Sequence, residues 1–229
     1  MKIIGLTGPS GTGKTTISDI AANLGYAIID CDKVAREVTN NQSLLNTLET
    51  EFGDVVIGGK LDRKALAEKA FATNDATEKL NSIMLPVIST AIDEKIKNLE
   101  KIGTEYILLD APTLYESGED KKCDAVIAVL ADIEIRAERI KKRDNLTPAQ
   151  LESRLKETKP DSFYQERTKY IICNNGNLLD FTKTFNCEFF VRSHFFIVDI
   201  FGNTANSIAA HFRTATICII HFHLKVRTF

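Results

Sequence analysis

The residues with the clearest chemical purpose stand near the start of the chain. Residues 8–15 read GPSGTGKT, in which one glycine and four free positions precede Gly13, Lys14 and Thr15. This is the spacing of a loop that binds phosphate groups. Glycine allows backbone angles closed to other residues, so successive N–H groups turn inward around an anion. Lys14 supplies a cation for the outer phosphates, and the hydroxyl of Thr15 is suited to ligate Mg²⁺.

The flanks of this loop have the pattern that a phosphate site requires. Residues 2–7 form a short apolar run typical of a buried strand, and residues 14–25 carry apolar side chains at helical spacing. A helix that begins near Lys14 directs the positive end of its dipole at the loop. A flexible glycine turn is the alternative, which the strand and the helix disfavour.

A second chemical feature is the pair of carboxylates after the next predicted strand, residues 26–30. Asp30 and Asp32 are two residues apart, so on an extended stretch both would point the same way. Because the carboxyl ends of parallel strands open on one crevice, we expect this pair near the phosphate loop. A carboxylate there accepts the proton of an attacking hydroxyl in phosphoryl transfer. These residues alone leave open the alternative that Asp32 only caps the following helix.

The elements that must position these residues alternate along the chain. Strands alternating with helices after a phosphate loop predict an α/β fold with a doubly wound, parallel five-stranded sheet. The runs expected to form strands are residues 2–7, 26–30, 105–112, 124–131 and 170–176. The helical patterns lie at residues 33–40, 41–53, 62–71, 76–103, 133–144, 147–157 and 177–185.

The helical patterns divide the expected domain, residues 1–186, into parts. Residues 33–103 are expected to form a helical insertion between the second and third strands, in which Pro86 kinks or splits the long pattern. Asp62 and Thr147 are suitable N-caps for the helices that follow them.

Composition limits the classes of protein that fit. At 229 residues the chain can bury a full core, and a formal charge of −2 disfavours a general nucleic-acid binder. Five cysteines without a C-x-x-C pair favour reduced, cytoplasmic thiols over disulfides or a zinc site. The first strand leaves no room for a signal peptide, and no apolar run has the length of a membrane helix. We expect a cytoplasmic protein that binds neither nucleic acid nor membrane.

Residues 187–229 differ from the rest of the chain. They contain all four histidines and eight of the thirteen phenylalanines, and they hold four Lys/Arg against two Asp/Glu. The histidine spacing fits no zinc-site pattern, and two apolar segments have the character of aggregation-prone strands. A frame-altered C-terminus is one interpretation, and the sequence assigns this tail no role.

Several segments resemble the dephospho-CoA kinase family over residues 1–186. The most diagnostic is the run from Asp30 to Arg36, which matches the family's I-D-x-D-x-I/V-A-R pattern. The other segments follow in the family's order: GLTGPSGTGKTT, EFGDVV, GKLDRKALAEKAF, LNSIMLPVI, DAPTLYESG, RAERIKKRD and IICNNG. The likeness leaves the tail uncovered.

This resemblance implies transfer of a phosphate from ATP to the 3′-hydroxyl of the ribose of dephospho-CoA, the last step of coenzyme A synthesis. It implies that the 33–103 insertion binds this acceptor and that residues 133–168 form a lid. Asp32 is implied as the base, with Arg36 beside the acceptor. The residues implied in catalysis are Asp32, Lys14 and Arg139. Those implied in ATP binding are Gly11, Thr12, Gly13, Lys14, Thr15, Thr16 and Arg143.

Three of the candidate side chains have two interpretations each. Arg139 and Arg143 are four residues apart on one helical face, from which both would close on the phosphates. A solvated basic face is the alternative. Asp110 ends a predicted strand, where it would organise Mg²⁺ together with Thr15, and a structural or capping role is the alternative.

The chain departs from the family pattern without losing a phosphate-handling group. Leu85 replaces the family's histidine, Thr113 a leucine and Thr158 a frequent glutamine, and the usual Ala-Asp before the last strand is missing. These changes bear on acceptor affinity and turnover more than on reaction type. Glu116 matches a family glutamate for which we derive no role.

Other functions stay open at this point. Another small-metabolite P-loop kinase, a nucleotide-binding module without transfer activity, and a kinase impaired by its tail are the alternatives. A candidate base and candidate lid arginines favour a kinase over a module. The sequence indicates no oligomeric state.

Overall fold

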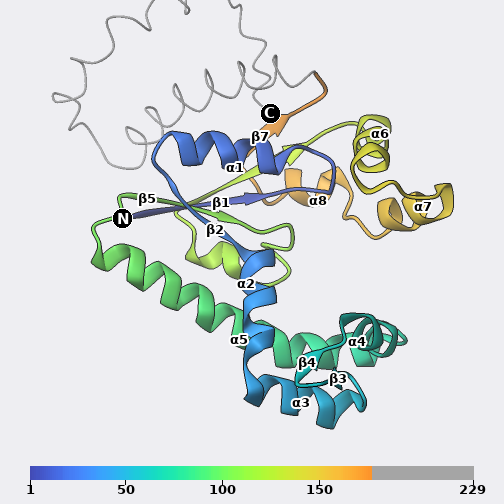
Figure 1. The fold of residues 1–229 in the computed structure, drawn as a ribbon. Coiled ribbons are helices and arrows are strands. Elements are labelled where there is room, and N and C mark those ends of the chain that lie inside the picture. Colours follow the sequence, from blue (N-terminus) through green and yellow to red (C-terminus); the bar gives the residue numbers. More distant parts are fainter. Residues whose placement is uncertain (177–229) are drawn as a thin grey trace, which may run out of the picture. The chain divides into compact units, whose positions relative to one another are not determined.

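A computed structural model describes residues 1–176 of the chain, which lie within one compact unit. The helix expected at 177–185 and the tail at 187–229 lie outside the described residues. Five strands form one parallel sheet in the order β2-β5-β1-β6-β7 (Figure 1). Their bounds are β1 Lys2–Thr7, β2 Ala27–Asp30, β5 Tyr106–Asp110, β6 Ala125–Leu130 and β7 Tyr170–Cys173. The predicted parallel five-stranded sheet is confirmed.

The core of the sheet follows from the continuous apolar runs of its strands. In β5, Ile107, Leu108 and Leu109 are fully buried, as expected of a parallel strand that is covered on both faces. Two helices, α1 (Lys14–Asn23) and α5 (Asn74–Lys101), lie on opposite faces of the sheet (Figure 1). Because the strands are parallel, their carboxyl ends share one edge of the sheet, at which the loops after β1, β2 and β5 meet.

The segment between β2 and β5 forms a helical insertion with a hydrophobic cluster of its own. Its buried members are Leu44, Leu48, Val55, Leu66 and Ala70. The elements are α2 (Cys31–Glu37), η1 (Val38–Asn40), α3 (Gln42–Phe52), α4 (Arg63–Ala70) and α5, with a short hairpin of β3 (Val56–Ile57) and β4 (Lys60–Leu61). The sequence analysis predicted no strand where this hairpin lies, because strands of two residues have no periodicity to detect.

Pro86 does not split the long helix, so of the two outcomes expected from the sequence, a kink or a split, the split is wrong. α5 is one helix from Asn74 to Lys101. The missing N–H of Pro86 frees the carbonyl of Ser82, and Ser82 is exposed, so water satisfies it. The helix packs on two cores along its length: Met84 and Val87, which flank the proline, contact the insertion cluster, and Ile92 lies beneath the sheet.

Three helices follow β6, and Tyr164 of the last one packs on Ala128 and Leu130 of that strand. They are α6 (Ile133–Asp144), α7 (Pro148–Lys156) and α8 (Asp161–Gln165). Thr147 and Gln150 form a reciprocal capping box at the start of α7, which confirms the predicted N-cap, and Asp62 caps α4. Within the described residues, no helix has both the length and the apolar character that crossing a membrane requires.

Candidate nucleotide site

The loop after β1 follows a path that glycine alone allows at two positions. Gly8 has φ +133°, and a Cβ atom there would lie 2.2 Å from the carbonyl oxygen of Val129. Gly11 has φ +83°, and its Cβ would lie 2.9 Å from the carbonyl oxygen of Arg136. The backbone thus presses against β6 and α6, and any side chain at these positions would force it away.

Three successive carbonyl groups of the loop accept hydrogen bonds from side chains elsewhere in the chain. Arg136 Nε donates to Ser10 O over 3.1 Å, and Arg139 Nη1 donates to Gly11 O over 3.4 Å. Asn174 Nδ2 donates to Thr12 O over 2.7 Å. The C=O and N–H of a peptide unit point in opposite directions. The amides that follow these carbonyls, on residues 11, 12 and 13, are therefore left facing the other way, where an anion would bind.

Lys14 lies within the loop. Its Nζ donates to Gly8 O over 2.7 Å and to Pro9 O over 3.1 Å. Burial lowers the pKa of Lys14 to about 8, although the charges of Asp110 and Asp32 act in the opposite direction. The ammonium group is thus poorly solvated and held by neutral carbonyls.

Asp110 ends β5 beside the loop and is held by a residue that the sequence did not single out. Ser18 Oγ, one turn into α1, donates to Asp110 Oδ2 over 2.6 Å. Burial raises the pKa of Asp110, whereas the Ser18 bond and the charge of Lys14 lower it. Thr15 is exposed in the first turn of α1. A hydroxyl and a carboxylate fit Mg²⁺, which takes one or two protein oxygens and fills its shell with phosphates and water.

The structure excludes one of the two interpretations of Asp32. α2 begins at Cys31, and Asp30 is its N-cap, with Oδ1 accepting a bond from Lys33 N over 2.9 Å. The capping interpretation of Asp32 is therefore wrong. The expected extended stretch is also wrong, since Asp32 lies in the first helical turn. Its carboxylate is exposed, and it lies close enough to Lys14 and Asp110 for its charge to raise the pKa of both.

Arg36 lies one helical turn beyond Asp32. Its Nε donates to the carbonyl oxygen of Asp32 over 3.1 Å, and its side chain is exposed. The base candidate and this arginine therefore face solvent on consecutive turns of α2.

The two arginines expected to close on phosphates have different surroundings. Arg139 donates to Gly11 O, to Asn174 O over 3.0 Å and to Gly176 O over 2.9 Å, so the carbonyls of two loops hold its guanidinium. Arg143 is more exposed. It pairs with Asp144, and its Nη2 lies 3.4 Å from Ser10 Oγ at the rim of the loop. Of the two, Arg143 is the one with access to a bound phosphate.

Arg136 is the main residue that the sequence analysis missed. Only 4% of it is exposed, and besides Ser10 O it bonds Thr158 Oγ1 over 2.8 Å. It belongs to none of the ion pairs among the described residues. A signal was present, because positions 136, 139 and 143 share one helical face. Thr158, a departure from the family pattern, is its partner and lies between α7 and α8.

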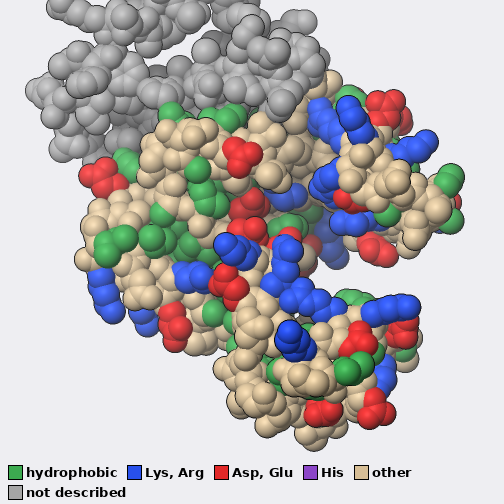
Figure 2. Space-filling model, in the orientation of Figure 1, with side chains coloured by type: hydrophobic (Ala, Val, Ile, Leu, Met, Phe, Trp, Pro, Cys, Tyr) green, Lys and Arg blue, Asp and Glu red, His purple; other side chains and the backbone are tan. Residues whose placement is uncertain are grey.

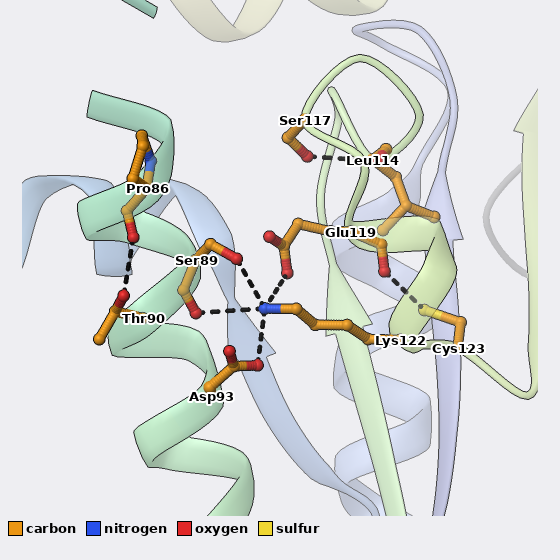
Figure 3. A network of polar contacts seen from close by, with 9 residues as sticks. All are labelled: Pro86, Ser89, Thr90, Asp93, Leu114, Ser117, Glu119, Lys122 and Cys123. Carbon is orange, nitrogen blue, oxygen red and sulfur yellow. Dashed lines mark hydrogen bonds and ion pairs between the residues drawn. The ribbon is translucent and has the colours of Figure 1, made fainter. Parts of the chain in front are cut away.

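A polar junction attaches the insertion to the nucleotide-binding part of the molecule. Lys122 Nζ, in η2 (Glu119–Lys122), donates to Ser89 O over 3.1 Å and pairs with Asp93 at 2.7 Å and Glu119 at 3.0 Å (Figure 3). Burial by itself lowers the pKa of Lys122, but its bonds to Asp93 and Glu119 raise it above the usual value. α5 is thus attached to the segment that follows β5.

Comparisons with known proteins agree with this geometry. A family model described as dephospho-CoA kinase matches residues 2–180. A dephospho-CoA kinase of Fusobacterium nucleatum is 35% identical over 184 residues, which cover 79% of this chain and 93% of that protein. One from Corynebacterium glutamicum is 35% identical over 180 residues, with 77% and 90% covered.

Solved structures show the same fold. A dephospho-CoA kinase from Campylobacter jejuni superposes with a TM-score of 0.63 at 25% identity, covering 85% of this chain and 98% of that one. A crystal structure of a Thermus thermophilus protein gives a TM-score of 0.72 at 26% identity, covering 83% and 97%.

Proposed function

Because the chain belongs to the dephospho-CoA kinase family, we propose that it transfers the γ-phosphate of ATP to the 3′-hydroxyl of the ribose of dephospho-CoA, giving coenzyme A. The observation that carries this proposal is the position of Asp32. An exposed carboxylate lies within electrostatic reach of the phosphate-loop lysine.

ATP binds, in this proposal, to the loop amides that the outside donors leave free, together with Lys14. The residues that would hold it are Gly11, Thr12, Gly13, Lys14, Thr15, Thr16 and Arg143. Thr15 and Asp110 would hold Mg²⁺, whose contribution when bound is to neutralise charge on the phosphates. The Ser18 bond supports this role for Asp110 because it orients the carboxylate.

Asp32 is the proposed general base. It accepts the proton from the 3′-hydroxyl as the oxygen attacks phosphorus, while Lys14 stabilises the negative charge on the transferring group. Arg36, one turn further along α2, is proposed to contact the acceptor.

The arginines of α6 divide their roles in this proposal. Arg143 contacts the phosphates, since its guanidinium lies at the open rim of the loop. The protein carbonyls around Arg139 support a positioning role for it in place of the direct catalytic role expected from the sequence. Arg136 is proposed to position the loop in the same way.

The parts of the domain also have proposed roles. The insertion at 33–103 binds the acceptor, and residues 133–168 form a lid whose closure excludes water from the reacting phosphate. A cytoplasmic location belongs to the proposal, since ATP is the donor and Cys31 and Cys123 are free thiols.

The test is direct. Purified full-length protein is incubated with Mg·ATP and dephospho-CoA, and the mixture is analysed for coenzyme A by mass spectrometry. We expect product from the wild type and none above background from Lys14→Ala. A folded protein that binds ATP but forms no coenzyme A would refute the proposed acceptor.

A further inference from the structure

We infer that α2, η1, α4 and α5 build an acceptor surface in which Arg63 binds the diphosphate of dephospho-CoA and a neighbouring groove holds its pantetheine arm. The inference rests on the proposed function and adds two subsites to it. It begins from a contact between segments that are far apart in sequence.

The first subsite is basic. Arg63, the first residue of α4, donates from Nη2 to Thr39 Oγ1 over 3.3 Å, and Thr39 Oγ1 donates to the carbonyl oxygen of Arg36 over 2.7 Å. The side chains of Arg36 and Arg63 are exposed, and neither belongs to an ion pair among the described residues. Figure 2 shows Lys and Arg side chains gathered over α2 and beside α4. Two arginines without carboxylate partners beside one turn suit a diphosphate, which guanidinium groups bind in bidentate fashion.

The second subsite is a groove of about 440 Å³ between η1 and α5. Val38, Pro86, Val87 and Ala91 give it an apolar wall, and Asn41, Thr90 and Glu94 add polar groups. The Oδ1 atom of Asn41 already caps α3, so its amide N–H groups are the part available to a ligand. An apolar groove with a few such groups suits a neutral chain that carries amides, as the pantetheine arm does. Glu94 disfavours a phosphate at this place.

The order of these groups along the protein matches the order of groups along the acceptor. From Asp32 to Arg36 the helix rises about 6 Å. The path from the 3′-oxygen of the ribose to the first phosphorus is five bonds, also about 6 Å. The groove residues Val38 and Asn41 come next along the chain, as pantetheine comes next after the diphosphate. In this inference a molecule with its 3′-hydroxyl at Asp32 has its diphosphate beside Arg36, whose carbonyl is joined through Thr39 to Arg63, and its arm in the groove beyond.

The first experiment removes the charge at the diphosphate subsite. Binding of dephospho-CoA and of Mg·ATP is measured by calorimetry on full-length Arg63→Ala, with the adjacent exposed Lys64→Ala as a matched control. Loss of a charge-assisted contact is expected to weaken dephospho-CoA about tenfold, with less effect at high salt, and to leave Mg·ATP unchanged. Wild-type affinity for dephospho-CoA in Arg63→Ala, or an equal loss for Mg·ATP, would overturn the diphosphate subsite.

The second experiment fills the groove. Thr90→Tyr places a ring at an exposed position of its wall, and Asn81→Tyr places one on the opposite side of the same helix. We expect Thr90→Tyr to weaken dephospho-CoA about tenfold at any salt concentration and to raise KM for it with little change in kcat. Asn81→Tyr should behave as wild type. If Thr90→Tyr binds dephospho-CoA normally, the pantetheine arm lies elsewhere.

Failure of the proposed function and failure of the proposed acceptor surface give different results in these experiments. If the wild-type protein binds Mg·ATP but neither binds dephospho-CoA nor forms coenzyme A, the proposed function itself fails. If the wild type is active and the Arg63 and Thr90 variants equal their controls, only the acceptor surface fails.

Discussion

Arg136 donates its Nε–H to the carbonyl oxygen of Ser10 over 3.1 Å, so a buried cation of α6 holds the backbone of the phosphate loop. The same guanidinium bonds Thr158 at the end of α7. One side chain therefore connects the loop that would bind ATP to the helices that would close over it. Because the contact to the loop is through a carbonyl, it sets the direction of the next amide, that of Gly11.

Replacing Arg136 is expected to weaken ATP binding, although Arg136 makes no contact with ATP in the proposed mechanism. In Arg136→Met the Ser10 carbonyl loses a charge-assisted bond, so the free energy of unfolding should fall by about 2 kcal/mol and KM for ATP should rise about tenfold. Thr158→Val is the matched control, because it removes the other contact and leaves the loop bond intact. For both variants, steady-state kinetics measures KM for ATP and urea unfolding measures the free energy of unfolding. Unchanged KM for ATP in a folded Arg136→Met protein would mean that the loop keeps its shape unaided.

The sequence predicted the parts of this site whose chemistry is local. Lys14 and Thr15 belong to a contiguous pattern, and the apolar strand that leads to Asp110 is equally plain. Asp32 was harder, because the helix begins two residues earlier than its pattern suggests and Asp30 takes the capping role. Arg136 and Asn174 could not be assigned from spacing alone, since their roles depend on which carbonyls lie opposite them once β7 and α6 have packed beside the loop.

Asp32→Asn separates binding from chemistry. An amide of the same shape cannot accept the proton of the 3′-hydroxyl, so kcat for coenzyme A formation should fall by about a hundredfold or more. Mg·ATP affinity should change little, because Asp32 lies outside the loop. Rapid-quench measurement of a single turnover, with excess enzyme, isolates the transfer step. A wild-type transfer rate would remove Asp32 from the mechanism.

The pKa of Lys14 predicts proton uptake on ATP binding. Burial lowers this pKa to about 8 from the usual 10.5, so the free protein holds fewer protons than the unfolded chain between these two pH values. The stability of the nucleotide-free protein should therefore rise with pH across that interval. Phosphates favour the charged lysine, so binding Mg·ATP at pH 8.5 should take up about three quarters of a proton, and at pH 7 much less.

Calorimetry in two buffers with different heats of protonation measures this uptake. The apparent binding enthalpy should differ between the buffers at pH 8.5 and nearly agree at pH 7. Equal enthalpies at pH 8.5 would show that Lys14 is already charged in the free protein.

The junction around Lys122 gives a prediction about stability alone. Only 4% of Glu119 is exposed, so Lys122→Ala leaves its carboxylate buried without its cation and should lower the free energy of unfolding by about 3 kcal/mol. Lys122→Met combined with Glu119→Gln removes both charges and should recover most of that loss. Urea denaturation of the three proteins checks this. A double variant as unstable as Lys122→Ala would mean that the pair matters through packing and not through charge.

The donors that hold the phosphate loop come from far along the chain, and this orders the events of synthesis. Residues 8–15 leave the ribosome early, whereas Arg136, Arg139 and Asn174 are made more than a hundred residues later. A nascent chain that ends before β7 contains the sequence of the loop but lacks Asn174, one of the donors that hold its conformation. ATP can therefore stabilise the folded chain only after the last strand is in place, and until then the fold depends on its apolar strands.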